Sequence, residues 1–437
     1  MKRATDIAAI LRVARPTPLM GPDFDQFYID ADQARGKSST LYLRDYLSNL
    51  ADVPQRILFT GHRGSGKTTE LWRLSRFLQD RFWISRFSVK EELDPLDLSY
   101  VDLTFVIIEQ LIAQAQKDGL KINERIAQRI WDWMADIKEI QTIIGRVESE
   151  GAVGVNLLAV LLAELKSAFK VSKETKKEIT RHVEPRLSTL LDNCNMLIQD
   201  LTNQVGRRGL VPLMIVEDLD KLEPSTAREL FINHSAVLLS FQMHIIYTVP
   251  IFMLYSTEAA EILDHFDLDE ILPVIKVHQR AGHEFPYPEG VDTIRRMVDR
   301  RMDLSLIEEE ALHLMIAKTG GCLRDLFDVL QRAALVTLRR EGTQIDKDAV
   351  QEGLKELRSR YERSITERRE GNTVIVSVQD YYARLAEISQ SPTKQPDNDL
   401  ALMDLLHSLA VLEYNGERWC DVHPIVMDIL RSRGLIP

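Results

Sequence analysis

A glycine-rich loop at residues 61–69 constrains the fold of this 437-residue chain more than any other feature. The loop fits the spacing of glycine, four residues, then Gly-Lys-Ser/Thr, a spacing that lets the main chain wrap phosphate groups. A short apolar run, residues 56–60, precedes it, and apolar residues recur at helical spacing after it, at Leu71, Leu74 and Leu78. The order of strand, glycine loop and helix therefore predicts a phosphate-binding loop.

The chemistry expected of the loop follows from its residue types. Glycines let the main chain curl with its N–H groups pointing inward, and the N-terminus of the next helix adds partial positive charge. Lys67 is then placed to reach the terminal phosphates of a nucleotide, and the Thr68 hydroxyl to ligate Mg²⁺. The residues predicted to bind the nucleotide are Gly61, His62, Arg63, Gly64, Ser65, Gly66, Lys67, Thr68 and Thr69.

A second apolar run, residues 211–216, ends in the acidic residues Glu217, Asp218 and Asp220. A buried strand that ends in carboxylates supplies what phosphate transfer to water requires, a magnesium ligand and a base that polarises water. We expect Glu217 and Asp218 to fill these two roles. The alternative is a solvated acidic turn after a core strand.

Two further residues are candidates for contact with the terminal phosphate. Thr248 ends the apolar run 243–248, where a hydroxyl can orient water, although a threonine at the end of a strand is also common for structural reasons. Arg324 stands in the first turn of a predicted helix, from which it can swing toward a phosphate; an exposed surface arginine is the alternative. Residues 305–308 fit a capping box that starts the preceding helix, and Gly320 is placed to end that helix.

These stretches resemble the AAA+ ATPases and the related STAND and KAP groups, and are most similar to the origin-recognition and replication-initiator branch. Residues 61–69 correspond to Walker A, 213–220 to Walker B, Thr248 to sensor 1 and 320–325 to sensor 2. The resemblance implies an α/β P-loop fold, an αβα sandwich with a parallel sheet and a helical lid, that binds and hydrolyses ATP with Mg²⁺. The predicted catalytic residues are Lys67, Glu217, Asp218, Thr248 and Arg324, and the predicted metal ligands are Thr68, Glu217 and Asp218.

Two departures from the family pattern limit this transfer. Glu217 stands where such families usually have aspartate, so the metal and base roles stay open between Glu217 and Asp218. Lys67 and Glu217 are also 150 positions apart (217 minus 67), which predicts a largely helical insertion at about residues 104–207. Within it, residues 165–186 carry seven Lys or Arg against three Glu, a basic stretch that suits nucleic acid, an acidic partner or a solvated helix face.

The C-terminal part resembles a winged-helix domain, since a predicted helix at 400–409 is followed by a hairpin that turns at Asn415-Gly416. Residues 378–437 hold nine acids and five bases, a net charge of −4 that favours contact with protein, or with the chain's own core, over DNA. The predicted division is an N-terminal segment at 1–50, a P-loop core at 51–285, a helical lid at 286–365 and the winged-helix-like domain at 375–437.

Composition narrows the functional classes further. The net charge of −11 argues against a surface built throughout to coat nucleic acid. The three cysteines, which are far apart, indicate no zinc site but a reducing compartment, and the longest nearly apolar run, 153–163, is too short to span a bilayer. We therefore expect a cytoplasmic protein without a membrane segment.

The leading hypothesis is an ATP-driven molecular switch of AAA+ or STAND type that acts on a partner protein or on its own assembly. Its resemblance to bacterial regulators suggests a role in defence. The alternatives are an ATP-gated DNA-binding initiator or loader, and a nucleotide-bound scaffold with little hydrolysis. The residues do not separate the candidates for an arginine that reaches a neighbour's nucleotide, which are Arg280, Arg295, Arg296, Arg300 and Arg301.

Overall fold

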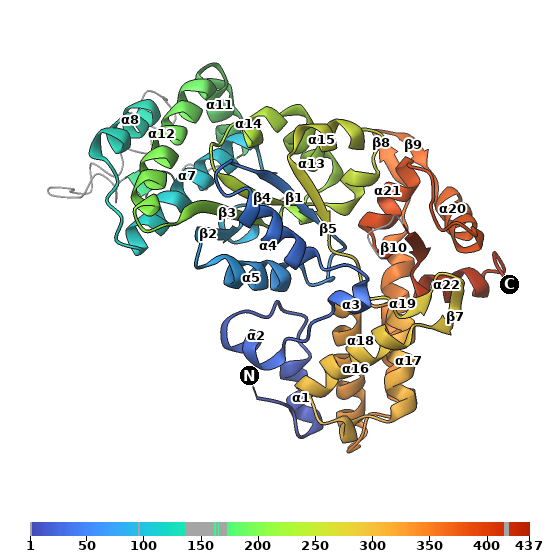
Figure 1. Cartoon of the computed structure of the whole chain (residues 1–437). Helices are drawn as coiled ribbons and strands as arrows, with labels where there is room; N and C mark the ends of the chain where they lie inside the picture. The colour runs from blue at the N-terminus through green and yellow to red at the C-terminus, as the bar shows by residue number, and fades with distance from the viewer. Residues whose placement is uncertain (1, 95–96, 136–160, 163–164, 166–172, 415–418) are drawn as a thin grey trace.

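A five-stranded parallel sheet forms the centre of the computed structural model, which describes residues 2–94, 97–135, 161–162, 165, 173–414 and 419–437 (Figure 1). The strands, in their order across the sheet, are β2 (Phe82–Ser88), β3 (Val211–Glu217), β4 (His244–Val249), β1 (Arg56–Thr60) and β5 (Leu268–Ile271). The predicted α/β fold with a parallel sheet is confirmed, and the predicted strands before the glycine loop and before the acidic residues are both present.

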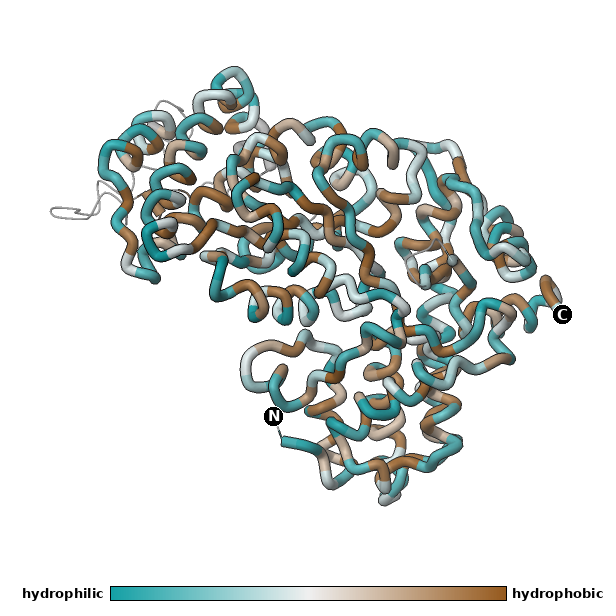
Figure 2. Tube along the Cα trace, in the orientation of Figure 1, coloured by the Kyte–Doolittle hydropathy of each residue, from teal (hydrophilic) through white to brown (hydrophobic). Residues whose placement is uncertain are grey.

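Helices cover both faces of the sheet because alternate strand residues point to opposite sides. Ile57 and Phe59 of β1 pack against α4 (Ser39–Asn49) and α5 (Lys67–Leu78) on one face. Leu58 points the other way, into the core shared with the helices of the opposite face. These helices are α7 (Tyr100–Lys117), α12 (Leu187–Gly206), α13 (Pro224–Arg228), α14 (Ser235–Leu239) and α15 (Ala259–His265). Figure 2 shows hydrophobic stretches concentrated along the central strands.

The chain between β2 and β3 is helical wherever the structure describes it. After the short α6 (Val89–Glu92) come α7, α8 (Glu124–Ala135), α11 (Lys173–Val183) and α12. In the described part of the basic stretch, Lys176 turns inward, donating a hydrogen bond to the main-chain oxygen of Asp97 and lying 3.8 Å from Asp102. Most of the apolar run 153–163, together with Lys166 and Lys170, lies outside the described residues.

Four helices form a bundle beneath the sheet in the view of Figure 1. They are α16 (Pro288–Arg301), α17 (Glu309–Thr319), α18 (Leu323–Arg339) and α19 (Lys347–Ser364). The capping box predicted at Ser305 is wrong, because the Asp303 carboxylate caps a separate 3-10 turn by accepting from Ser305 N at 3.0 Å. Ile307 is then extended and bridges to Ile345, so α17 starts only at Glu309. Gly320 ends α17 in the left-handed region, as predicted.

The N-terminal segment joins this helical bundle to the core. Its first helix, α1 (Ile7–Val13), rests on α18, where Gln331 donates to the main-chain oxygen of Leu11 at 2.9 Å. The segment then passes through α2 (Gly21–Phe27) and α3 (Asp32–Arg35) before α4 reaches the sheet. Residues 1–50 are therefore packed against the bundle as well as leading into the core.

The C-terminal residues form a compact module that packs against both core and bundle. It contains the hairpin β8 (Arg368–Glu370) and β9 (Thr373–Val376), then α20 (Val378–Gln390), α21 (Leu400–His407), β10 (Val411–Tyr414), β11 (Trp419–Val422) and α22 (Pro424–Ser432). The predicted hairpin β10–β11 is confirmed, whereas its Asn415-Gly416 turn lies outside the described residues. The Tyr414 hydroxyl donates to the main-chain oxygen of Gly320 at 2.9 Å, so the hairpin is held in the protein interior.

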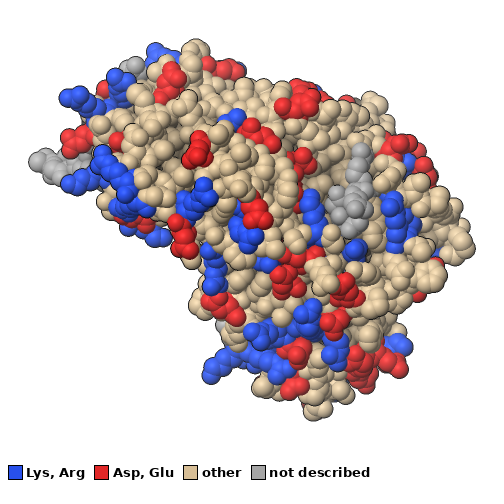
Figure 3. All heavy atoms as spheres, viewed as in Figure 1, with Lys and Arg blue, Asp and Glu red and all other residues tan. Residues whose placement is uncertain are grey.

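Charge on the visible face is mixed. Figure 3 shows acidic and basic side chains interspersed, with Lys and Arg gathered around the N-terminal end of the chain. Across the part of the chain that the structure describes, every helix is too short or too polar to cross a membrane.

Candidate nucleotide-binding site

The glycine loop curls between β1 and α5 at the carboxyl end of the sheet, the position at which open α/β sheets bind ligands. Gly64 and Gly66 have φ values of 88° and 103°, in the left-handed region that side chains with a Cβ avoid. A Cβ on Gly64 would also lie only 2.5 Å from Cβ of Arg324. The glycine at position 64 therefore sets the loop's curl and admits the bundle helix α18 against it.

Lys67 begins α5 and is almost fully buried. Its ammonium donates to the main-chain oxygens of Gly61 at 2.6 Å and His62 at 2.9 Å, and forms an ion pair with Asp220 at 2.8 Å. Burial lowers the pKa of Lys67, and the Asp220 carboxylate opposes that shift. The structure thus places one buried ammonium at the mouth of the loop.

Glu217 ends β3 and points toward the start of α5. Arg86 of β2 forms an ion pair with its carboxylate and also donates to the main-chain oxygen of Thr68 at 3.0 Å. Burial raises the pKa of Glu217, an effect that Arg86 and the Thr68 hydroxyl oppose. The two predicted metal ligands Thr68 and Glu217 are therefore neighbours, and Arg86 is a partner that the sequence analysis did not name.

Asp218 and Asp220, the other two acids of this run, have partners different from those of Glu217. Asp218 sits at φ 69° and accepts from the Ser88 hydroxyl at 2.7 Å, and Lys221 forms an ion pair with it. These partners lower its pKa although burial works in the opposite direction. Asp220, on the 3-10 turn that follows, is the acid that reaches Lys67. Asp218 and Asp220 both line the cavity described below.

Thr248 lies near the end of β4 with its hydroxyl bound on both sides. It donates to the main-chain oxygen of Val216 at 3.2 Å and accepts from Leu219 N at 3.1 Å. Thr248 is buried and does not line the cavity. In this arrangement the hydroxyl holds the turn that carries Asp218 and Asp220.

Arg324 occupies the first turn of α18 and lines the cavity beside Gly64. Among the described residues its guanidinium makes no hydrogen bond or ion pair. Arg63, in contrast, donates to the main-chain oxygen of Lys221 at 3.0 Å. The sequence-predicted Arg324 thus faces the loop as a cation without a protein partner.

The remaining loop residues divide into two groups. Gly64, Gly66, Lys67, Thr68 and Thr69 line the cavity. The other predicted loop residues, Gly61, His62, Arg63 and Ser65, do not line it. His62 instead accepts from Glu413 N at 2.7 Å, a contact with the C-terminal hairpin, and its pKa is lowered to about 3 by burial.

A cavity of about 340 Å³ lies between the loop, the N-terminal segment and the bundle. The cavity lining combines the polar residues above with an apolar set, which suits a ligand that carries both charged groups and a flat heterocyclic ring. The apolar lining consists of Pro16, Pro18, Leu19, Phe27, Tyr28, Ile29, Met297, Leu323 and Phe327. The sequence analysis missed these residues, because an apolar run such as 27–29 cannot be told from ordinary core in the sequence.

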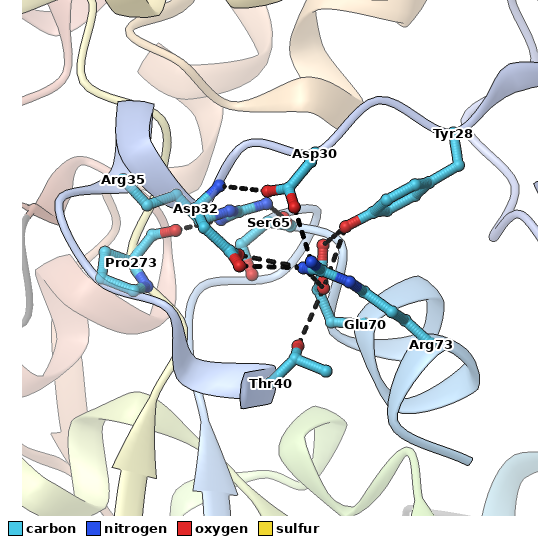
Figure 4. Close-up of polar contacts among 9 residues, drawn as sticks. All are labelled: Tyr28, Asp30, Asp32, Arg35, Thr40, Ser65, Glu70, Arg73 and Pro273. Atoms are coloured by element: carbon cyan, nitrogen blue, oxygen red, sulfur yellow. Dashed lines mark hydrogen bonds and ion pairs between the residues drawn. The ribbon is translucent and has the colours of Figure 1, made fainter. Parts of the chain in front are cut away.

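A network of charges, buried except at Asp30, ties the N-terminal segment to the helix that follows the loop (Figure 4). Arg73 of α5 forms ion pairs with Asp30 at 2.5 Å, Asp32 at 3.0 Å and Glu70 at 3.4 Å. The Tyr28 hydroxyl donates to Glu70 at 3.1 Å, so the network positions one aromatic ring of the cavity. Arg35, from α3, donates to the main-chain oxygen of Ser65 at 2.7 Å and so holds the loop from behind.

No protein-family model matches the chain, and no curated protein matches it. Among solved structures it is similar to the Walker-type ATPase PABY2304 of Pyrococcus abyssi, with 13% identity over 96% of this chain and 99% of that chain and a TM-score of 0.46. It is also similar to the ORC2 protein of Aeropyrum pernix, with 11% identity over 97% of this chain and 98% of that chain and a TM-score of 0.43. A third similar structure is Cdc6p of Pyrobaculum aerophilum, with 12% identity over 99% of this chain and 98% of that chain and a TM-score of 0.38. Proteins of the origin-recognition branch, named from the sequence, are thus among the solved structures to which the chain is similar.

Proposed function

We propose that this chain binds ATP with Mg²⁺ in the 340 Å³ cavity and hydrolyses it to switch conformation. The observation that carries the proposal is the composition of that one cavity. The glycine loop with its buried ammonium would form the phosphate end of the site, and the apolar lining would form the base end. The Arg324 guanidinium, which has no partner among the described residues, lines the cavity beside Gly64. Polyphosphate, base and terminal phosphate each have a matching surface.

Phosphate oxygens would compete with main-chain oxygens for the hydrogen bonds of the Lys67 ammonium. This ammonium is held by two main-chain oxygens, of Gly61 and His62, and these are weaker acceptors than charged phosphate oxygens. A bound polyphosphate tail would take over these bonds while the inward N–H groups of the loop contact its other oxygens. Asp220 would then remain as the anionic partner that keeps Lys67 charged in a buried setting.

The residues beside the loop fit a magnesium ion. Thr68 and Glu217 offer a hydroxyl and a carboxylate, the hard oxygen ligands that Mg²⁺ prefers, on neighbouring elements. When bound, Mg²⁺ would neutralise charge on the β- and γ-phosphates. Arg86 pairs with Oε1 of Glu217, whereas Oε2 of Glu217 has no hydrogen-bond partner among the described residues, so Oε2 is the oxygen available to the ion.

Three carboxylates are candidates for the base that polarises the attacking water. Asp218 is held by Ser88 and Lys221, and Asp220 by Lys67, whereas Glu217 meets both Arg86 and Thr68. We propose that Glu217 supports the metal and that Asp218, which lines the cavity with an ionised carboxylate, polarises the attacking water.

The switch would run from Arg324 and the loop to the C-terminal module. Next to Arg324, the buried Asp325 carboxylate lies 3.3 Å from Nε2 of His423 and accepts from Tyr361 at 2.7 Å. On the loop side, His62 contacts Glu413 of the same module. A movement of α18 toward phosphate therefore strains contacts of the C-terminal module, and we propose that the module passes this change to a protein partner or to further copies of the chain in the cytoplasm.

Nucleotide titration of a Lys67→Ala variant tests the central assignment. The variant loses the buried ammonium of the loop, and we expect ATP affinity to fall at least about 100-fold, in line with loss of a charge-assisted contact in a buried site. Calorimetry in the presence of Mg²⁺ measures this directly. Lys355→Ala, at an exposed site on α19, is the matched control and should bind like the parent.

The alternative function is ATP-dependent DNA binding, and one feature of the fold, the position of the hairpin β10–β11, disfavours it. The described strands of the hairpin β10–β11 are buried, and Tyr414 contacts Gly320 and Val274, which favours contact with the chain's own core over contact with DNA. ATP-dependent retention on DNA at low salt would revive this alternative.

A further inference from the structure

Three potential metal ligands meet at a place outside the nucleotide cavity. His278 of β6 (His278–Gln279), His283 of β7 (Gly282–Pro286) and Asp421 of β11 each present one ligand atom, and these atoms all lie within 4.8 Å of one another. Nε2 of His283 is 3.2 Å from Oδ2 of Asp421, and the two imidazole rings stack at 4.1 Å. None of the three residues lines the nucleotide cavity.

His278 is held in the tautomer that a metal requires. Its Nδ1 lies 2.9 Å from the main-chain oxygen of Gln279, which can only accept, so the ring proton sits on Nδ1. Nε2 therefore carries a lone pair; it is buried and has no hydrogen-bond partner among the described residues. The residue is only 3% exposed. A buried lone pair without a donor costs free energy that a metal ion would recover.

Asp421 is oriented by its other oxygen. Oδ1 accepts from Lys394 at 3.0 Å and from Val422 N at 2.9 Å, which leaves Oδ2 toward the histidines without a hydrogen bond of good geometry. Lys394 is held in turn by the main-chain oxygen of Ser389 at 2.7 Å. Lys394 thus acts as an outer-shell partner that fixes the carboxylate and leaves its second oxygen free.

We propose that His278, His283 and Asp421 bind one Zn²⁺ ion, with water as the fourth ligand. Two imidazoles and one carboxylate form a donor set that suits zinc, whose ligand atoms in a tetrahedral site are about 3.3 Å apart. His283 lies on a two-stranded hairpin and its side chain is 14% exposed, so it is the ligand free to close the remaining distance and the one beside which water enters. Its ring takes the tautomer with the proton on Nδ1.

The site joins two parts of the molecule that the sequence keeps far apart. His278 and His283 belong to the hairpin between the sheet and the helical bundle, whereas Asp421 belongs to the C-terminal module. A zinc ion here would fasten that module to the core beside the contact of Tyr414 with Gly320. It would therefore stabilise the arrangement without taking part in nucleotide chemistry.

The test uses the full-length protein stripped with a chelator and then titrated with Zn²⁺ or with Co²⁺. We expect one equivalent of zinc to bind, a visible absorption band typical of tetrahedral Co²⁺, and a higher Tm with zinc. His283→Gln and Asp421→Asn should each weaken zinc binding at least about tenfold. His313→Gln, an exposed histidine on α17, is the matched control and should bind zinc like the parent.

Two results would overturn the proposal. One is a parent protein that takes up no stoichiometric zinc and gives no tetrahedral Co²⁺ band, as expected if the cluster is only an ion-pair network around Lys394. The other is unchanged zinc affinity in both ligand variants. Because His283 is partly exposed and does not line the nucleotide cavity, its glutamine variant should bind ATP normally, which separates this test from that of the proposed ATPase.

Discussion

The two ends of the nucleotide cavity are built in opposite ways. One continuous stretch, residues 61–69, supplies the loop and the ammonium of the phosphate end. The base end is assembled from residues 16–19 and 27–29 of the N-terminal segment, from α16 and from α18. Phosphate recognition depends on main-chain geometry that a few adjacent residues determine, whereas base recognition depends on apolar surfaces brought together by packing. Single substitutions should therefore act strongly at the first end and weakly at the second.

Glu217→Gln should have the largest effect on turnover among changes that spare binding. Loss of the carboxylate that the proposal gives to Mg²⁺ beside Thr68 should lower kcat about 100-fold, while ATP affinity, which depends mainly on Lys67 and the glycine loop, stays near that of the parent. Phosphate release measured alongside nucleotide titration separates the two quantities.

Asp218→Asn and Asp220→Asn complete that comparison. We expect Asp218→Asn to lower kcat, and Asp220→Asn to weaken ATP binding because it removes the ionic partner of Lys67. Parent-like turnover in both Glu217→Gln and Asp218→Asn would instead indicate a nucleotide-bound scaffold.

Arg324→Ala should have an intermediate effect that depends on the nucleotide. Because the guanidinium faces the loop without a protein partner, we expect the Kd for ATP to rise about tenfold. The Kd for ADP should change less, since the missing phosphate is the one Arg324 is placed to contact. Arg332→Ala on the same helix, whose side chain pairs with Asp328 and Glu356, is the matched control. Equal losses for ATP and ADP would remove Arg324 from the switch.

Phe327→Leu should have a smaller effect, at the base end. The substitution keeps most of the buried volume but removes the ring face, over which the Arg301 guanidinium lies at 4.2 Å. We expect the Kd for ATP to rise about fivefold because part of the apolar contact with the base is lost. Leu335→Ala, at an exposed position of α18, controls for changes in the helix. An unchanged Kd for both ATP and ADP would place the base elsewhere.

The smallest expected effect is that of His62→Gln on how much the Tm falls in acid. Folding lowers the pKa of His62 from 6.5 to about 3, so the folded state prefers the neutral ring that accepts from Glu413 N. This contribution is fully present above pH 6.5 and is lost as the pH falls toward 3. Thermal unfolding between pH 7 and about 4 should show a smaller fall in Tm for the variant than for the parent. A parallel fall in both, as expected for His313→Gln, would contradict this role.

Local signals accounted for the elements around the loop. The strand predicted at residues 56–60 is β1 with those bounds, and the acidic residues do follow a buried strand. The helix does not start at Ser305 because Asp303 caps a separate turn there and Ile307 bridges to Ile345. A capping box is a local pattern, and here a contact with a distant residue decided the backbone instead.

Contacts between residues far apart in the sequence are the main feature of the site that the sequence did not predict. The ion pairs of Arg86 with Glu217 and of Lys67 with Asp220 join different strands and turns, and no spacing in the sequence predicts them. The contact of His62 with the C-terminal hairpin spans 351 positions and is equally hidden. The hairpin itself was predicted, but its burial beside the loop was not.

The order of strand, glycine loop and helix was determined by the sequence alone, because glycine conformations and apolar periodicity act over a few residues. The assignment of each acid to a partner, the apolar end of the cavity and the cluster of His278, His283 and Asp421 were decided only by tertiary structure. These features arise where separate segments pack, and the free energy of packing depends on surfaces that no short stretch contains.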